Sequence, residues 1–306
     1  MAVSILLAAY NNGKYIGQLI DSILAQSFWD FTLYIRDDCS DDDTMAVVLS
    51  YADKRIKIIP NDRPSGSAQN NFFALLLGCD DDYIMFADAD DVWLPDKIER
   101  TLELMKRAEK EHGVHRPVLA HTDLTVVNEE LETIADSMFR YEKLSPKRTG
   151  LGQLLVQNNV TGCTAMINRA LRRMVEQQPG ISVMHDWWLA LVASAFGAVA
   201  VLDKPTILYR QHGANQVGAY DAGNLAAAAK KLSRRSEMRE IYALMYAQAG
   251  CFADTFSQQL SEQQLVICRA FESMKDKGKF GRISTIVRHK FYKNTLLRNI
   301  GQIITV

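Results

Sequence analysis

The sequence predicts an α/β protein built on a mostly parallel, doubly wound sheet, and three observations support this prediction. Short apolar runs alternate with segments of helical periodicity over residues 3–110, as in repeated strand–helix units. The first run, residues 3–9, is almost continuously apolar, which is typical of a strand buried on both faces. Polar residues follow three expected strands, at 10–11, 37–38 and 88–90, where the carboxyl ends of parallel strands would meet in one crevice.

The same alternation assigns the elements in chain order. Strands are expected at residues 3–9, 31–35, 55–59, 83–87, 118–123, 160–168 and 199–202. Helices are expected at residues 16–24, 44–52, 67–77, 98–110 and 151–158, from His185 onward, and after Asp221, where Leu225, Ala228, Leu232, Ile241, Leu244 and Met245 recur. A loop or lid is expected at residues 136–150. No Gly-x-Gly-x-x-Gly motif follows the first strand, which disfavours a Rossmann dinucleotide site.

Composition and charge narrow the class of protein. The 306 residues are 48% hydrophobic and 23% charged with a net charge of −1, which predicts a globular protein without general affinity for nucleic acid. Five cysteines are scattered without a Cys-x-x-Cys pair: Cys39, Cys79, Cys163, Cys251 and Cys268. This pattern predicts reduced thiols rather than a zinc site or a disulfide framework. The sequence has no basic n-region at residues 1–4 and no apolar run of roughly 18–20 residues, so we expect a cytoplasmic protein.

The end of the fourth expected strand holds an acidic cluster. Asp88, Asp90 and Asp91 follow an apolar run directly, and they would repel one another unless they share a cation. Hard ions such as magnesium and manganese prefer oxygen ligands and leave room for substrate phosphates. The cluster therefore predicts a site for a divalent metal and a diphosphate. An acidic loop that caps the next helix is the alternative, because an isolated Asp-x-Asp pattern is common.

Three ordered blocks resemble the signature motifs of glycosyltransferase family 2, the inverting sugar transferases with a GT-A fold. They are Ala-Ala-Tyr-Asn at residues 8–11, Asp-Asp-Cys-Ser-Asp-Asp-Asp-Thr at 37–44, and Phe-Ala-Asp-Ala-Asp-Asp-Val-Trp-Leu-Pro-Asp-Lys at 86–97. Three blocks in order are far more specific than any one alone. The resemblance covers about residues 3–218 and implies a GT-A domain that binds a nucleotide-sugar donor and a divalent metal, manganese or magnesium.

The resemblance also implies roles for individual residues of the donor site. Tyr10 would lie against the nucleobase, and Asp38, or Asp37 in its place, would accept a hydrogen bond from a base N–H group. Asp88 would meet the ribose or the metal, and Asp90 would bind the metal that bridges the donor diphosphate. The other expected nucleotide-sugar contacts are Ala8, Asn70, Asn71, Ala89, Arg210 and His212.

The segment Tyr-Arg-Gln-His-Gly at residues 209–213 resembles the Tyr-Arg-x-His block near the end of family 2 catalytic domains. Arg210 would offer charge to phosphate. His212 would complete a metal shell with Asp88 and Asp90, or contact the pyrophosphate. We expect this polar segment to follow a strand and to close over the diphosphate.

His185 and Asp186 begin a later expected helix. In the family that the sequence resembles, Asp186 would be the general base that deprotonates the acceptor hydroxyl, with His185 as a supporting residue. The position of Asp186 in the first turn of the expected helix is also typical of a helix cap. Trp187 and Trp188 would line the acceptor sugar, although either residue would equally suit a hydrophobic core.

Small residues open the expected strand at 160–168, where they would let the backbone approach a ligand closely. Gly162 and Cys163 are therefore expected on the acceptor side. The blocks at 160–164, 185–188 and 209–213 together resemble bacterial rhamnosyltransferase-like members of the family, which implies dTDP-L-rhamnose as the donor.

A basic stretch ends the chain. Beyond Ser273, apolar residues interleave with eight cationic residues and one acidic residue: Lys275, Asp276, Lys277, Lys279, Arg282, Arg288, Lys290, Lys293 and Arg298. This pattern predicts either peripheral contact of residues 275–300 with the anionic cytoplasmic face of the cell membrane or a helix packed on the protein with a solvated basic face.

These observations predict two domains and one main function. Residues 1–218 would form the catalytic domain, with a nucleotide-binding half at 1–97 and an acceptor half at 98–218, and residues 219–306 a helical region. The resemblance implies sugar transfer to a glycan or lipid-linked acceptor in bacterial surface polysaccharide synthesis, such as that of capsule or O-antigen. A haloacid-dehalogenase-type phosphohydrolase is one alternative, because residues 88–92 fit its Asp-x-Asp-x-Val motif, although three strands precede them. A non-catalytic sugar- or lipid-binding relative is the other.

Overall fold

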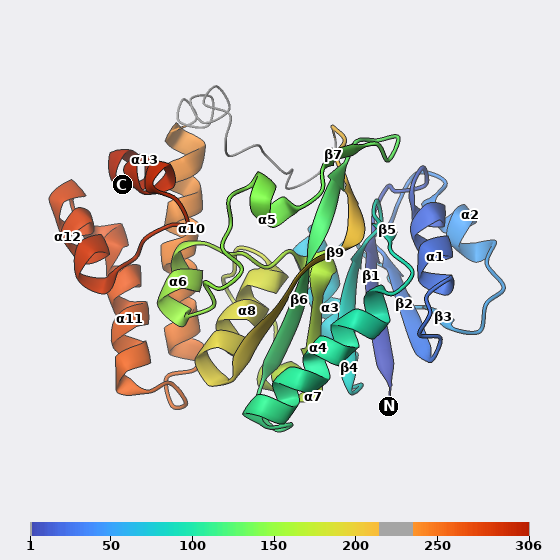
Figure 1. The fold of residues 1–306 in the computed structure, drawn as a ribbon, viewed down its shortest axis with the longest axis horizontal. Coiled ribbons are helices and arrows are strands. Elements are labelled where there is room, and N and C mark those ends of the chain that lie inside the picture. The colour runs from blue at the N-terminus through green and yellow to red at the C-terminus, as the bar shows by residue number, and fades with distance from the viewer. Residues whose placement is uncertain (1, 214–234, 306) are drawn as a thin grey trace. The chain divides into compact units, whose positions relative to one another are not determined.

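The computed structural model describes residues 2–213 and 235–305, which form two compact units (Figure 1). Of these residues, the sheet unit contains 2–138, 160–178 and 198–213, and the helical unit contains 139–159, 179–197 and 235–305. The chain thus passes between the units several times, whereas the sequence predicts continuous domains with a boundary at residue 218. Leu225, Ala228 and Leu232 lie outside the described residues.

The sheet unit is built on a mixed sheet with the strand order β3-β2-β1-β4-β8-β6-β9-β5, and β7 pairs with β6 (Figure 1). The strands are β1 Val3–Ala9, β2 Phe31–Asp37, β3 Ile56–Ile58, β4 Tyr83–Asp88, β5 Val92–Trp93, β6 Val118–Val127, β7 Thr133–Ala135, β8 Ala165–Asn168 and β9 Ala198–Arg210. The helices of this unit are α1 Ile16–Leu24, α2 Thr44–Leu49, α3 Ala68–Leu77, α4 Lys97–His112, the 3₁₀ helix η1 Gly162–Thr164 and α7 Arg169–Met174.

Strand β1 lies at the centre of the parallel half of the sheet. Ile5 on β1 is opposite Leu33 on β2 and Met85 on β4, and all three side chains are fully buried. Helix α3 packs against β1 and β2, and α4 packs against β6, β8 and β9. The expected strand buried on both faces is therefore confirmed, and the carboxyl ends of β1, β2 and β4 lie along one edge of the sheet.

Strand β9 is longer than the sequence predicts and changes how the polar segment at 209–213 is held. It runs from Ala198 to Arg210, so Tyr209 and Arg210 belong to the strand rather than to a segment that follows it. The register with β6 shifts at Pro205, which has no N–H group for the ladder. Val92 on β5 pairs with Leu208 on β9, which brings the acidic cluster before β5 next to the end of β9.

Two further elements differ from the sequence-based expectation. Only residues 165–168 of the expected strand at 160–168 are extended, and the small residues before them form η1. The region expected to be a loop or lid at 136–150 contains a short helix, α5 Met138–Tyr141.

The helical unit is built around aromatic side chains. Its other helices are α6 Leu151–Val156, α8 His185–Phe196, α10 Arg235–Thr255, α11 Glu262–Glu272, the 3₁₀ helix η2 Ser273–Asp276, α12 Lys279–His289 and α13 Leu296–Thr305. Trp188 on α8 packs edge-on against Phe252 on α10, with ring centroids 5.4 Å apart, and Phe271 packs against Phe291 at 5.0 Å. These contacts bury an apolar face of each helix, which stabilises helices that would be marginal alone.

Candidate active site

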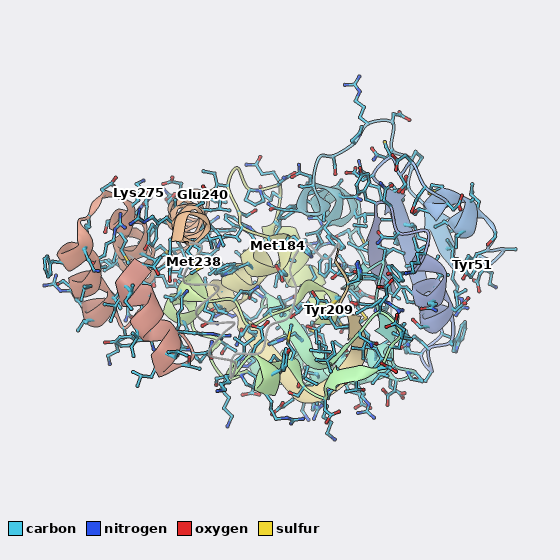
Figure 2. The ribbon with its side chains drawn as sticks, turned by 90° about the horizontal axis from the view of Figure 1, so that it is seen from above. Tyr51, Met184, Tyr209, Met238, Glu240 and Lys275 are labelled. Carbon is cyan, nitrogen blue, oxygen red and sulfur yellow. The ribbon has the colours of Figure 1, made fainter. Side chains whose placement is uncertain are left out.

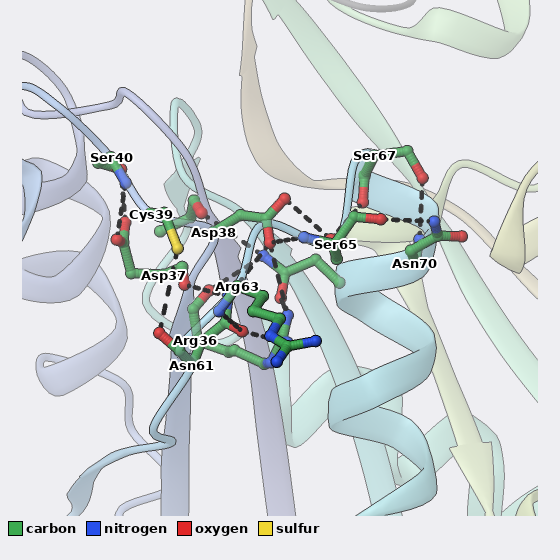
Figure 3. Close-up of polar contacts among 12 residues, drawn as sticks. Arg36, Asp37, Asp38, Cys39, Ser40, Asn61, Arg63, Ser65, Ser67 and Asn70 are labelled. Carbon is green, nitrogen blue, oxygen red and sulfur yellow. Dashed lines mark hydrogen bonds and ion pairs between the residues drawn. The ribbon is translucent and has the colours of Figure 1, made fainter.

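The carboxyl end of β2 holds Asp38 in a set of hydrogen-bond donors (Figure 3). Asp38 Oδ1 accepts hydrogen bonds from the Ser65 backbone N–H at 2.6 Å and from Asn61 Nδ2 at 3.2 Å, and Oδ2 accepts one from Ser65 Oγ at 2.8 Å. The residue is only 6% exposed. A carboxylate has about four acceptor sites, so three of these bonds leave about one for a ligand N–H group.

The position of Asp38 is stabilised by three neighbouring side chains, Arg36, Asn61 and Asn71. Arg36 donates from Nη1 to Asn71 Oδ1 and from Nη2 to Asn61 Oδ1, and its Nη1 lies 3.7 Å from Asp38 Oδ1. Asn71 is buried, and its Nδ2 donates to the Arg36 carbonyl at 3.1 Å. Asn71 therefore holds the protein backbone together here, and its expected contact with the nucleoside stays a prediction.

Asn70, Asp37 and Tyr10 lie along the same edge. Asn70 Nδ2 donates to the Ser65 carbonyl at 2.7 Å (Figure 3). Its Oδ1 accepts a hydrogen bond from Gln178 Nε2 at 2.6 Å. The Asp37 carboxylate accepts hydrogen bonds from the backbone N–H and hydroxyl groups of Ser40 and so forms the turn after β2. Tyr10, directly after β1, is 58% exposed, as an aromatic side chain that stacks on a ligand would be.

The carboxyl end of β4 concentrates negative charge in a small volume. Ala8 on β1 is the register partner of Asp88, and Ala89 is buried at 4% exposure. Asp91 is fully buried, and its Oδ1 accepts a hydrogen bond from the Arg210 backbone N–H at 3.2 Å. Burial, followed by the charges of Asp90 and Asp88, raises the pKa of Asp91 well above its usual value.

Cys163 lies beside these carboxylates because η1 packs against β4. Asp88, Asp91 and Cys163 each offer one ligand atom, and these atoms lie within 4.8 Å of one another. Burial, together with Asp91 and Asp88, raises the pKa of the Cys163 thiol well above its usual value, so the thiol stays protonated. Gly162 is buried in the same turn. Both residues therefore belong to the sheet unit, and their expected contact with an acceptor stays a prediction.

Lys97 is a buried cation near the same cluster. It is fully buried at the start of α4, and its Nζ lies 4.8 Å from the centroid of the Trp93 ring. Burial lowers its pKa to about 8, against the opposing effects of Cys163 and Asp91. The ammonium group lies over an aromatic face, which stabilises its charge in this low-dielectric surrounding.

Arg210 connects the end of β9 to the acidic cluster. Its guanidinium donates from Nε to the Asp90 carbonyl at 2.8 Å, from Nη1 to the Glu129 carbonyl and from Nη2 to Gln18 Oε1 at 2.5 Å. The residue is 2% exposed, and its guanidinium lies over the Tyr15 ring at 4.8 Å. In this structure Arg210 positions the Asp90 backbone, and its expected contact with phosphate stays a prediction.

His212 contacts Asp90 directly. His212 Nε2 lies 2.9 Å from Asp90 Oδ2, and the imidazole stacks on Tyr15 with ring centroids 4.9 Å apart. The Tyr15 hydroxyl donates to Glu129 Oε1 at 2.7 Å, which fixes the ring. The structure thus brings together two of the expected metal ligands, Asp90 and His212, from distant parts of the sequence.

The donor set of this cluster fits a divalent cation. Asp88, Asp90 and Asp91 lie at one strand end, where burial and then the charges of Asp90 and Asp88 raise the pKa of Asp91. Carboxylate oxygens with one imidazole nitrogen suit manganese or magnesium, whereas a protonated thiol does not. Asp88, Asp90 and His212 stay the predicted ligands, and of these Asp90 and His212 are in direct contact.

The second candidate catalytic residue, Asp186, lies in the helical unit. It is in the first turn of α8 and is 8% exposed. Its Oδ1 accepts a hydrogen bond from the Trp187 backbone N–H at 2.7 Å, and its Oδ2 lies 3.4 Å from Asn158 Nδ2. These contacts suit both a helix cap and an oriented general base, so the role of Asp186 stays a prediction.

The neighbours of Asp186 separate into polar and core residues. Burial lowers the pKa of His185 to about 3, so its imidazole is neutral. Trp188 is 1% exposed among Phe252 and Phe256, which corresponds to the core alternative rather than to a sugar contact. Trp187 is less buried than Trp188, and its Nε1 donates to the Leu154 carbonyl at 2.6 Å.

Several residues of this site were not predicted from the sequence. Asn61 and Ser65 appear in the sequence only as parts of a turn, and the structure shows that this turn wraps Asp38. Tyr15 and Glu129 are far apart in the chain, and only the fold brings them to His212 and Arg210. Asp91 was named in the acidic cluster, but its full burial was not predicted.

The sequence is similar to those of curated glycosyltransferases. Among curated relatives, the chain is 29% identical over 230 residues to the dTDP-rhamnosyl transferase RfbG of Shigella flexneri, covering 70% of this chain and 74% of that protein. It is 35% identical over 103 residues to the UDP-Glc:alpha-D-GlcNAc-diphosphoundecaprenol beta-1,3-glucosyltransferase WfgD of Escherichia coli, covering 34% of this chain and 40% of that protein.

The fold is also similar to a solved structure. TarS 1–349 of S. aureus, in complex with UDP-GlcNAc, superposes with a TM-score of 0.58 at 16% identity, covering 99% of this chain and 90% of that one. This likeness confirms the expected GT-A-type fold with a helical C-terminal part. Residues 4–175, more than half of the chain, match the model of glycosyl transferase family 2. The chain therefore belongs to glycosyltransferase family 2 and is a glycosyltransferase.

Proposed function

We propose that this enzyme transfers L-rhamnose from dTDP-L-rhamnose to a hydroxyl group of a glycan or lipid-linked saccharide, with inversion at the anomeric carbon. The similarity to a curated dTDP-rhamnosyl transferase supports the donor sugar. The contact of Asp90 with His212 at the carboxyl end of β4 supports a site for the donor diphosphate there. Neither the phosphohydrolase nor the non-catalytic alternative is favoured, because the chain belongs to a family of transferases.

The donor would be held at two neighbouring strand ends. Tyr10 would stack on the nucleobase, and the remaining acceptor site of the Asp38 carboxylate would take a base N–H group. Ala8 has a short side chain beside Asp88, which leaves room for the ribose. We assign the nucleobase to the β2 end because hydrogen-bond donors surround its carboxylate. We assign the diphosphate and its metal to the β4 end because carboxylates cluster there.

The β4 end would hold manganese or magnesium through Asp88, Asp90 and His212. When bound, the metal neutralises charge that builds on the leaving nucleoside diphosphate. Tyr15 and Arg210 would keep His212 and the Asp90 backbone in place, because each makes several contacts with fixed neighbours. In the metal-bound enzyme, His212 and Asp90 would both bind the metal instead of contacting each other.

Asp186 would act as the general base. Its carboxylate is oriented by the Trp187 N–H group and by Asn158, and one oxygen would accept the proton of the acceptor hydroxyl as the new glycosidic bond forms. The neutral imidazole of His185 beside it adds no competing positive charge.

The acceptor side is proposed from two observations. Family relatives include a transferase whose name specifies a diphosphoundecaprenol-linked sugar, which supports a lipid-linked acceptor in bacterial surface polysaccharide synthesis. Residues 275–300 carry a strong excess of cationic side chains, which supports peripheral contact with an anionic membrane face. Among the described residues, none of the helices has both the length and the apolar character to span a bilayer.

A donor panel tests the proposed sugar. With manganese present, release of the nucleoside diphosphate should be fastest with dTDP-L-rhamnose and much slower with UDP-glucose, UDP-galactose or UDP-GlcNAc. The rhamnose methyl group alone discriminates by only about 1–3 kcal/mol, so the nucleobase must contribute to the preference. Faster turnover of a UDP-hexose would contradict the rhamnose assignment while leaving the transferase activity intact.

The variant Asp186→Asn tests the proposed base in the same assay. Asn keeps the shape and most of the hydrogen bonds but cannot accept the proton, so kcat should fall by roughly 10²–10⁴-fold. Donor affinity and the melting temperature should stay near wild type, because an Asn side chain caps a helix about as well. Retained turnover with retained stability would leave Asp186 as a helix cap only.

A further inference from the structure

A cavity of about 170 Å³ opens in the helical unit among α10, η2, α12 and α13. Figure 2 shows α10 end-on with Lys275 of η2 beside it. The side chains that matter for the argument are Arg239, Tyr242, Tyr246, Lys275, Arg282 and Thr305. No acidic residue is among the described residues that line the cavity, so its walls have a positive charge and several hydrogen-bond donors.

Two of the three cations have no acidic partner within the described parts of the chain. The Arg282 side chain is held by backbone carbonyl groups of η2. Its Nε donates to the Met274 carbonyl at 2.8 Å and its Nη2 to the Lys275 carbonyl at 3.3 Å. Arg239 is exposed at the edge of the cavity and makes no ion pair with any described residue. Lys275 is paired, since its Nζ lies 3.0 Å from Glu272 Oε1. Among the described side chains, the cavity wall therefore has two cationic groups without an acidic partner.

Two tyrosine hydroxyl groups in the cavity wall are also unsatisfied. Tyr242 and Tyr246 are 4% and 2% exposed, and neither hydroxyl has a hydrogen-bond partner among the residues that the structure describes. Buried tyrosine hydroxyls normally have a partner. Burial raises the pKa of Tyr246 to about 12, so its hydroxyl stays a donor at neutral pH. Donors without acceptors, beside unpaired cations, are what an oxyanion site offers.

The helices α12 and α13, which contribute Arg282 and Thr305 to the cavity wall, also carry exposed apolar side chains. Phe280 on α12 is 88% exposed, and on α13 Leu296, Ile300 and Ile304 are 78%, 46% and 41% exposed. The spacing of four residues places the three α13 side chains on one helical face. Exposed apolar side chains combined with a basic sequence are typical of helices that lie in a membrane interface.

We propose that this cavity binds the headgroup phosphate of an anionic phospholipid, with Arg239, Arg282, Tyr242 and Tyr246 as donors. The apolar side chains of α12 and α13 would enter the acyl region while the phosphate occupies the cavity. This site deepens the proposed membrane contact, but it requires neither the donor sugar nor the chemistry at the sheet unit. Free inorganic phosphate shares the same chemistry and is the alternative occupant.

Thermal unfolding in inorganic phosphate tests the cavity itself. At constant ionic strength, phosphate should raise the melting temperature of the wild-type enzyme relative to chloride, because it binds the folded state alone. Arg239→Gln should weaken phosphate binding about tenfold, as expected for the loss of one charge-assisted hydrogen bond. Arg288→Gln removes the same charge from an exposed position on α12 outside the cavity and should leave the phosphate effect unchanged.

Tyr246→Phe separates binding from folding, because it removes one unsatisfied hydroxyl and no charge. Its melting temperature in chloride should equal or exceed that of wild type, whereas its stabilisation by phosphate should be reduced. On vesicles, the wild-type enzyme should bind phosphatidylglycerol–phosphatidylcholine mixtures far better than pure phosphatidylcholine, and Tyr246→Phe should bind the mixed vesicles several-fold more weakly.

Each remaining outcome counts against part or all of the proposal. No stabilisation by phosphate, or equal loss in Arg239→Gln and Arg288→Gln, would overturn the cavity as an anion site. Stabilisation by phosphate without a vesicle effect of Tyr246→Phe would assign the cavity to a free anion and overturn the lipid assignment. Because none of these measurements uses a sugar donor, failure here is distinct from failure of the proposed transferase specificity.

Discussion

Two strand ends in the sheet unit carry carboxylates, but the protein surrounds them differently. At the end of β2, Asp38 accepts three hydrogen bonds from Ser65 and Asn61 and lies near Arg36. At the end of β4, burial and two neighbouring carboxylates raise the pKa of Asp91, and Asp90 contacts His212. A carboxylate surrounded by donors is stable as an anion and suits recognition of an N–H group. Crowded carboxylates suit a cation.

The largest expected effect comes from Asp90→Asn at the β4 end. The variant loses one candidate metal ligand and the carboxylate that contacts His212, so turnover should fall by roughly 10³-fold or more. Weaker binding of the nucleoside diphosphate in manganese should accompany the loss, with the melting temperature retained. Full activity of Asp90→Asn, or of the wild type in excess chelator, would contradict the assignment.

Asp38→Asn should act on a different property. Replacing the carboxylate removes a charged acceptor for the base, so the Kd for the donor should rise about 10–100-fold, as for a hydrogen bond to a charged group. kcat at saturating donor and the response to manganese should change little. A loss of metal dependence in Asp38→Asn would contradict the assignment of base recognition to the β2 end and of metal binding to the β4 end.

The smallest expected effect concerns stability. An Asp-to-Asn substitution should raise the melting temperature at the β4 end and lower it at the β2 end. Because the pKa of Asp91 is raised above 3.8 in the folded protein, the folded state holds a proton that the unfolded chain has released. Stability should therefore fall as pH rises from about 4 toward the raised pKa. Asp91→Asn removes this cost and keeps an oxygen for the Arg210 N–H group. Its melting temperature at pH 7 in chelator should exceed wild type by about 2 °C or more, with the difference vanishing near pH 4.

Asp38→Asn is the matched control for this measurement. The same substitution at the β2 end weakens hydrogen bonds from Ser65 and Asn61, so it should lower the melting temperature at pH 7. Stabilisation by both substitutions, or by neither, would contradict the contrast between a carboxylate with donors and one crowded by charge.

The sequence predicted the frame of the sheet unit well, since alternating apolar runs specify strands such as β1 and β4 with little ambiguity. The acidic strand ends were predictable for the same reason, because the chemistry directly follows a buried run. The positions of Arg210 and Trp188 were not. A cationic or aromatic residue looks alike in sequence whatever it contacts, and the contacts of Arg210 with Asp90 and of Trp188 with Phe252 depend on the fold.

The partition of the chain into units was also beyond local patterns. Composition changes near residue 221, yet residues 139–159 and 179–197 pack with the later helices. Such packing depends on contacts between segments far apart in the chain, such as that of Trp188 with Phe252, and no single segment carries that information.

The most direct test of the account is calorimetric binding of thymidine and of thymidine diphosphate, each with and without manganese, to the wild type, Asp38→Asn and Asp90→Asn. The account predicts that manganese strengthens binding of the diphosphate but not of the nucleoside in the wild type. Asp90→Asn should abolish this gain and leave thymidine binding unchanged, whereas Asp38→Asn should weaken both ligands and preserve the gain. A gain from manganese that survives in Asp90→Asn, or that is lost in Asp38→Asn, would contradict the account.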